Sequence, residues 1–105
     1  MNATTLFEVG KYFQSNGRDD IFYDMIKECI NIDKTFAPSF IEVSNINRGK
    51  GNFVSEKVAL IGFLNCPVTA FTLDLIPQVK ARVQEIDRIL SGQQPIQPQQ
   101  PQVVK

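Results

Sequence analysis

The chain has 105 residues, 43% of them hydrophobic, and its eleven basic and eleven acidic residues give a formal net charge of zero. This length supports one domain, and the balanced charge disfavours nucleic acid or an anionic membrane as a partner, since both usually attract proteins with a basic excess. The sequence contains no histidine and no metal-spaced set of ligands. We therefore expect no enzyme activity, no catalytic residues, and no metal or other cofactor.

The first predicted helix follows Thr5, which forms a capping-box pattern with Glu8. We expect Gly17 to end this helix, because glycine readily adopts the left-handed conformation found after helix C-termini. The apolar residues of the segment recur at the spacing of one helical face: Leu6, Val9, Gly10 and Phe13.

Two further helices are predicted between residues 19 and 46. Asp19 and Asp20 open the first of them, at the end where the helix dipole favours acidic side chains. We expect it to end near Asp33. Pro38 then marks the first turn of the next helix, where proline has no N–H bond to lose. The sequence NRGKGN at 47–52 is predicted to form a loop.

Residues 53–76 allow two predictions. Ser55 can cap a fourth helix, but the apolar runs 58–64 and 70–76 can also pair as a β-hairpin within 57–76, which would make the fold α+β. Helical patterns on both sides favour an all-α array of about five antiparallel helices. Pro77 is expected to start or kink the last helix, and Ser91-Gly92 to end it.

The composition changes after this helix, so we divide the chain into a helical interaction domain, 1–91, and a tail, 92–105. A segment of Gln and Pro with three aliphatic residues cannot form a packed core, and a disordered, solvated tail is one interpretation. Pro95, Pro98 and Pro101 are also spaced by three, which is one turn of a polyproline II helix. An extended segment that docks on a partner is therefore the second interpretation.

Cys29 and Cys66 form no C-x-x-C pair, and we interpret them as buried small apolar residues of a protein in a reducing compartment. The first residues lack the basic region and apolar core of a signal peptide. The longest apolar run is far short of the ~20 residues needed to cross a bilayer. We therefore expect a cytoplasmic protein without membrane insertion.

A weak internal repeat relates residues 3–36 to residues 37–70. Small residues at Gly10, Ser44 and Cys29 would let paired helices approach closely. A period of 34 with paired helices resembles the tetratricopeptide repeat. The likeness depends on Val9, Gly10, Phe13, Gly17, Cys29, Asp33, Ala37, Phe40, Val43, Ser44 and Gly51, and the sequence departs from the family pattern at Phe22, Lys34 and Asn47. A generic helical bundle remains the alternative.

The resemblance implies a protein-binding module whose concave face is lined by the first helix of each pair. On this interpretation the chain is an adaptor or a structural subunit of a larger cellular or viral assembly, and its partners are other proteins, neighbouring subunits or further copies of itself. The candidate partner-binding residues are Phe7, Lys11, Gln14, Ile41, Asn45, Arg48, Lys50, Pro95, Pro98 and Pro101.

The segment Arg48–Asn52 supports an alternative function. It is the only basic cluster of the chain, and its glycines would let backbone N–H groups approach a phosphate. A nucleic-acid-associated accessory protein that acts through this loop is the second hypothesis.

Overall fold

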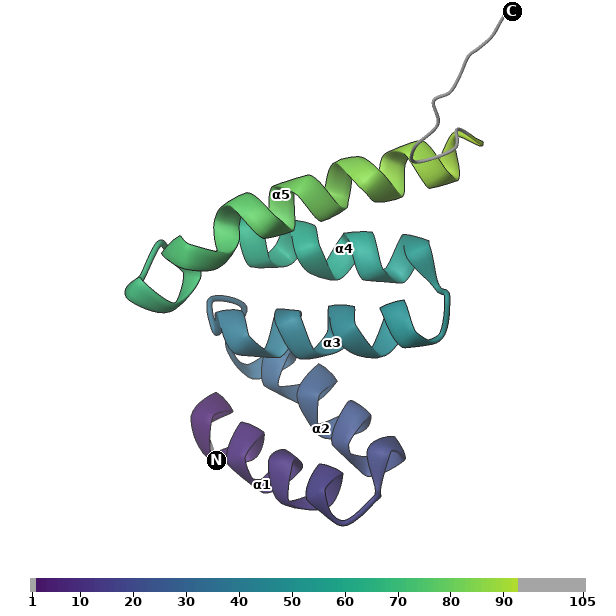
Figure 1. The fold of residues 1–105 in the computed structure, drawn as a ribbon. Coiled ribbons are helices and arrows are strands. Elements are labelled where there is room, and N and C mark those ends of the chain that lie inside the picture. Colours follow the sequence, from purple (N-terminus) through teal and green to yellow (C-terminus); the bar gives the residue numbers. More distant parts are fainter. Residues whose placement is uncertain (1, 93–105) are drawn as a thin grey trace, which may run out of the picture.

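In a computed structural model of the chain, which describes residues 2–92, five α-helices form a stack in chain order (Figure 1). Consecutive helices run antiparallel, and no strand occurs among the described residues. The helices are α1 (Ala3–Ser15), α2 (Asp19–Ile32), α3 (Ala37–Gly49), α4 (Phe53–Leu64) and α5 (Ala70–Leu90). The all-α prediction is thus confirmed, and the alternative of a hairpin at 57–76 is wrong.

The first apolar run is helical because its buried residues follow a helical spacing. Ala59, Leu60 and Phe63 face the core, whereas Val58 and Ile61 face outward. The second run lies in the first turns of α5, where Thr69 and Thr72 form a capping box: each hydroxyl accepts a hydrogen bond from the other residue's backbone N–H. The expected start at Pro77 is wrong, since this proline lies inside α5.

Two other expected boundaries differ from the structure. Asn2, not Thr5, caps α1, and its side-chain oxygen accepts a 2.8 Å hydrogen bond from the Thr5 N–H. The predicted loop 47–52 is too long, because α3 continues through Gly49 and α4 begins at Phe53. Asn47 is buried, and its amide donates to the Val43 carbonyl and the Tyr23 hydroxyl, which holds this turn in the helix.

The helix boundaries recur along the chain. Ala3 and Ala37, the first residues of α1 and α3, are 34 positions apart, and both helices have 13 residues. The first residues of α2 and α4 have the same offset, as do Gly17 and Gly51, whose φ angles are +77° and +71°. Only glycine adopts this left-handed conformation readily, so each glycine turns the chain between the two helices of a pair.

The core is a strip rather than a sphere. Each helix packs mainly on its neighbours in the sequence, and the principal extents are 60 × 30 × 19 Å. Phe22 and Ile26 of α2 pack with Val43 and Ala59 from the second pair, whereas Phe63 packs in a second cluster with α5. The array therefore depends on each pair burying the exposed face of the next.

Two glycines allow close helix contacts. A Cβ atom at Gly62 would collide with the Phe40 ring, so α4 approaches α3 more closely than alanine permits. At Gly10 the Cβ would lie 3.3 Å from the Phe22 ring, which places this residue at the contact of α1 with α2.

Both cysteines are buried and unpaired, in agreement with the sequence-based interpretation. The Cys29 thiol donates to the Ala3 carbonyl, and the Cys66 thiol to the Gly62 carbonyl. Among the described helices, none combines the length and the apolar character needed to cross a bilayer.

Candidate functional site

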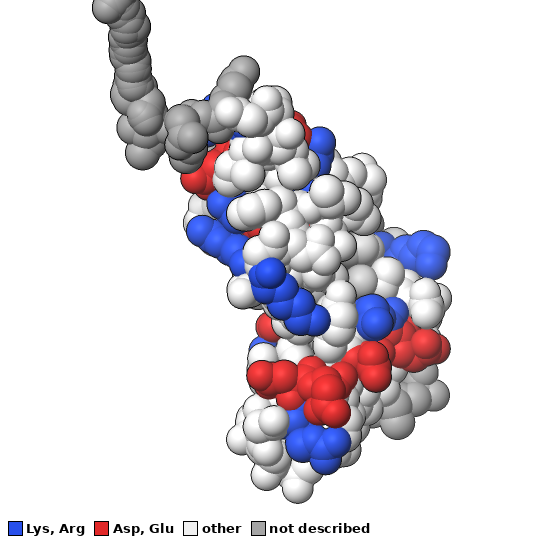
Figure 2. Space-filling view, turned by 90° about the vertical axis from the view of Figure 1, so that its right-hand side faces the viewer, with Lys and Arg blue, Asp and Glu red and all other residues white. Residues whose placement is uncertain are grey.

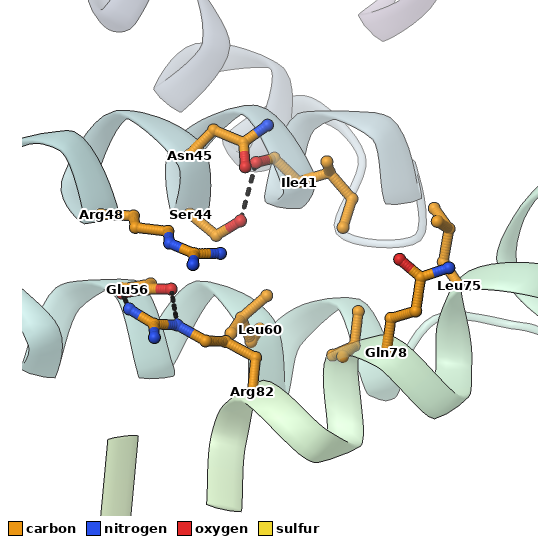
Figure 3. Close-up of a pocket in the computed structure, with 10 residues that line it drawn as sticks. Ile41, Ser44, Asn45, Arg48, Glu56, Leu60, Leu75, Gln78 and Arg82 are labelled. Carbon is orange, nitrogen blue, oxygen red and sulfur yellow. Dashed lines mark hydrogen bonds and ion pairs between the residues drawn. The ribbon is translucent and has the colours of Figure 1, made fainter. Parts of the chain in front are cut away.

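A groove lies between α3 and α5, with α4 beneath it (Figure 3). Its volume is about 180 Å³. The three helices supply, in chain order, Ile41, Ser44, Asn45, Arg48, Glu56, Leu60, Leu75, Gln78, Val79 and Arg82. The groove thus combines residues that are up to 41 positions apart in the sequence, from Ile41 to Arg82.

An ion pair between Glu56 and Arg82 forms the floor at one end of the groove. The Arg82 guanidinium donates two hydrogen bonds to the two carboxylate oxygens of Glu56, at 2.7 and 2.9 Å. Its third nitrogen donates to Glu85 at 2.8 Å, and the guanidinium carbon lies 5.9 Å from the centre of the Phe53 ring. The Glu56 side chain is only 2% exposed.

These contacts pair the Arg82 cation with carboxylates at all three of its nitrogens. The hydrogen bonds from Arg82 to Glu56 raise the pKa of the guanidinium, so Arg82 is charged throughout the accessible pH range. Hydrogen bonding to Arg82 also lowers the pKa of Glu85. Because a carboxylate already satisfies Arg82 from below, the pair attaches α5 to α4 and is not an open anion site.

The rim of the groove carries polar groups that point to solvent. Asn45 and Arg48 lie on α3, and Gln78 lies on α5. All three side chains are exposed, and within residues 2–92 none of them forms a side-chain hydrogen bond or an ion pair. Ser44 differs, since its hydroxyl donates to the Ile41 carbonyl at 2.7 Å. Two amides and one cation are therefore available to a ligand.

Apolar side chains form the walls below this rim. They come from all three helices and are Ile41, Leu60, Leu75 and Val79. At about 180 Å³ the hollow is smaller than the roughly 300–1,000 Å³ of typical small-molecule sites. Its volume is closer to that of one aliphatic side chain than to that of a small-molecule ligand.

The structure brings together only some of the residues expected to bind a partner. Ile41, Asn45 and Arg48 share the groove. Lys11 is engaged within the chain: its ammonium lies 2.7 Å from Glu42 and 3.3 Å from Gln14.

Two further expected residues lie outside the groove. Phe7 is half-buried and packs edge-on against Phe36, with ring centres 5.5 Å apart. The Lys50 ammonium lies 4.6 Å from the centre of the Tyr23 ring on α2, whereas Arg48 lines the groove. The two cations of the NRGKGN segment thus lie on different surfaces. Pro95, Pro98 and Pro101 lie outside the described residues.

Charge on the molecular surface is mixed. Figure 2 shows a band of acidic side chains across one face of the lower helices, with basic groups both above and below it. This face therefore offers no extended basic surface of the kind that follows a nucleic-acid backbone.

Sequence reasoning missed the residues of the groove that come from α4 and α5. Neither Glu56 nor Arg82 is among the candidate residues that the sequence indicates. The repeat of 34 residues could have identified Glu56, because it aligns this residue with Phe22, which is completely buried. A charged residue at a core position of a repeat indicates a buried ion pair.

Within residues 2–92, no cluster of three or more His, Cys, Asp or Glu side chains is arranged to hold a metal ion. The groove combines apolar walls with two exposed rim amides and one exposed cation. Comparisons with protein-family models, with curated proteins and with solved structures find no match to this chain.

Proposed function

We propose that this chain is a non-enzymatic protein-interaction module, which holds an extended segment of a partner protein in the groove between α3 and α5. It acts as an adaptor or as a structural subunit of a larger assembly. The observation that carries the proposal is the unpaired rim of Asn45, Arg48 and Gln78 above apolar walls. Binding sites commonly combine an apolar hollow with a few polar groups that orient the ligand.

The groove also indicates the chemistry of the partner segment. An aliphatic side chain fits between Ile41 and Val79, and a neighbouring carboxylate would pair with the Arg48 guanidinium. We therefore expect an acidic residue next to an aliphatic one in the bound peptide.

The recurrence of helix boundaries at 34 residues supports a tetratricopeptide-like arrangement of the two helix pairs. In such an array the first helices of successive pairs line the binding face. On this proposal α5 takes the place of the first helix of a third pair, and the α3–α5 groove is the surface between two such helices.

The buried, unpaired thiols of Cys29 and Cys66 support a location in the cytoplasm, where cysteines stay reduced. Arg48 lines the groove, whereas Lys50 lies over the Tyr23 ring, so the two cations do not form one basic surface. The nucleic-acid hypothesis therefore has less support than the peptide hypothesis.

An array of peptides in which the positions of acidic and aliphatic residues are varied systematically, probed for binding of the chain, tests the function. We expect selected peptides to lose tenfold or more of their affinity for Arg48→Glu, because a charge-assisted hydrogen bond contributes about 1.5–3 kcal/mol. Lys50→Glu is the matched control, since it changes the same charge two positions away and outside the groove. Undiminished binding by Arg48→Glu would contradict the proposal, and so would equal losses in both variants with a steep salt dependence.

A further inference from the structure

The exposed side of α4 is entirely aliphatic. The exposed residues of this helix are Val54, Val58 and Ile61, which we call the outer stripe, and they are 59%, 67% and 40% exposed. Its two charged residues, Glu56 and Lys57, are both ion-paired with side chains of α5. The helix therefore presents an apolar surface to solvent and no unpaired charge.

The repeat of 34 residues provides an internal reference for this surface. Ile26 of α2 and Leu60 of α4 correspond in the repeat and are both buried, and so are Cys29 and Phe63. The two helices therefore turn the same positions toward the core, and their exposed sides can be compared residue by residue.

The two exposed sides differ in chemistry. The α2 positions that correspond to the outer stripe are Asp20, Asp24 and Lys27, all of them exposed, and Asp24 forms an ion pair with Lys27 at 3.6 Å. The fold thus accepts charged side chains at these positions and does not require the aliphatic residues of α4. A contiguous apolar surface where the same fold accepts charge indicates a site of interaction.

The outer stripe forms part of a furrow. Together with Lys57 and Leu90, which is 48% exposed, it lines a hollow of about 390 Å³. A second hollow of about 300 Å³ also has Val58 in its lining, together with Tyr23 and Ile30 of α2. The furrow therefore runs from the end of α5 across α4 to α2, and it shares no residue with the α3–α5 groove.

The furrow borders an acidic helix. Helix α2 and its N-cap carry four carboxylates against two cations, and all six side chains are exposed: Asp19, Asp20, Asp24 and Glu28 against Arg18 and Lys27. The charges of α4 are balanced and paired with α5. A ligand in the furrow therefore meets aliphatic side chains on α4 and a net negative charge along α2.

We propose that the furrow binds an amphipathic helix of another protein, which places aliphatic side chains on the outer stripe and basic side chains toward α2. The members of the outer stripe are four and three positions apart, which is the spacing of residues along the contact line of two packed helices. Helices commonly dock in apolar grooves through anchors at this spacing. Opposite charges beside the apolar contact then select the partner and fix its register.

A second copy of the chain is a poorer occupant. Its aliphatic helix, α4, carries a single lysine, and Asp87 already pairs with that lysine. The copy would therefore bring no free cation to α2 from this helix. An anionic membrane surface is disfavoured too, because the carboxylates of α2 would repel it.

Titration of the full chain with two synthetic helical peptides tests the proposal. Both peptides carry leucine at positions i, i+4, i+7 and i+11, and they differ only in having lysine or glutamate beside this stripe. The lysine peptide should shift the methyl NMR signals of Val54, Val58 and Ile61. At low salt it should bind at least about fivefold more tightly than the glutamate peptide, which is the effect of one exposed ion pair.

Matched variants assign the binding to the furrow. Val58→Asn should weaken the lysine peptide about tenfold, because a valine side chain is no longer buried on binding. Val68→Asn is the control, since Val68 is also 67% exposed but lies outside both hollows. Replacing Asp20 and Asp24 together by asparagine should reduce the difference between the two peptides.

Several results would overturn the proposal. These are the absence of methyl shifts, equal affinities of the parent chain for both peptides, and binding that Val58→Asn does not weaken. Outer-stripe signals that respond to phospholipid vesicles and not to the peptides would assign the furrow to lipid. Self-association of the chain that Val58→Asn abolishes, without peptide binding, would assign the furrow to a second copy.

Discussion

Glu56 and Arg82 form an ion pair in a strip-like core whose other buried residues, within 2–92, carry no charge. Removing both charges from water is costly, and their mutual attraction offsets this only with good geometry. Two short hydrogen bonds to Glu56 and one to Glu85 supply that geometry. The net contribution of the intact pair to stability is therefore small, but the loss of one member is expensive.

The variant Glu56→Gln should lower the free energy of unfolding by about 3 kcal/mol, because it removes the buried carboxylate and leaves the largely buried guanidinium with only the partly exposed Glu85 as a charged partner. Urea denaturation measures this change. A double variant, Glu56→Leu with Arg82→Met, should recover most of the loss, since an apolar pair of similar volume replaces the ion pair. If the double variant is as unstable as Glu56→Gln, volume rather than charge determines the effect.

The thiols of Cys29 and Cys66 should react slowly in the folded chain. Burial raises the pKa of both groups, and the reactive species is the thiolate. At pH 7 a chromogenic disulfide should modify them far more slowly than in urea. A fast phase in the native protein would show that one of the thiols is exposed.

The same shifts predict a loss of stability at high pH. A raised pKa in the folded state means that folding favours the protonated thiol, so the stabilisation is complete below the unfolded pKa of about 8.5. It is lost as the pH rises through the folded values. Urea midpoints measured from pH 7 to pH 10 should therefore fall at the alkaline end, and replacement of both cysteines by alanine should flatten this dependence.

At the scale of the elements, the close contact between α3 and α4 requires a residue without a side chain at Gly62. Gly62→Ala places a methyl group against the Phe40 ring, and because packed cores accommodate added volume poorly, we expect a loss of about 2 kcal/mol. Calorimetry of this variant measures the loss.

Gly49→Ala is the control on the same helix pair. No atom lies within 4 Å of its added methyl group, and alanine is the better helix former, so stability should be unchanged or slightly higher. Adding Phe40→Leu should partly rescue Gly62→Ala. Without such rescue, the clash is not with the ring.

At the scale of the whole molecule, each helix is stabilised mainly by the one before it and the one after it. Central helices have two such neighbours, whereas α1 and the end of α5 have one. Hydrogen exchange should therefore be slowest in α3 and α4 and fastest in α1 and the last turn of α5. Uniform protection along residues 2–92 would instead indicate a single cooperative unit.

The sequence predicted those features that depend on local chemistry. The glycine turns at 17 and 51, the acidic start of α2 and the serine–glycine end of α5 all follow from residues within one turn of the boundary. The loop at 47–52 was overestimated because its composition is typical of loops. Burial of Asn47 against Tyr23, 24 positions earlier in the chain, keeps its first half helical.

Most of the groove could not be predicted from local sequence, because it too depends on contacts between residues far apart in the chain. Three of its four α3 residues, Ile41, Asn45 and Arg48, followed from the position of that helix in the repeat. Its floor requires Glu56 to meet Arg82, 26 positions later, and its far wall requires α5 to lie across α4. Such pairings depend on how the helices stack, which periodicity within one helix does not specify.

The stack also determines how the molecule would respond to mechanical load. The first helix, α1, lies at one end of the array and α5 at the other, so the two ends of the described chain do not meet as they do in many compact domains (Figure 1). A pulling force applied through them would run along the 60 Å axis and act on one helix contact after another. The array should therefore extend in small successive steps, beginning at its terminal helices, and behave as a compliant spacer between whatever it connects.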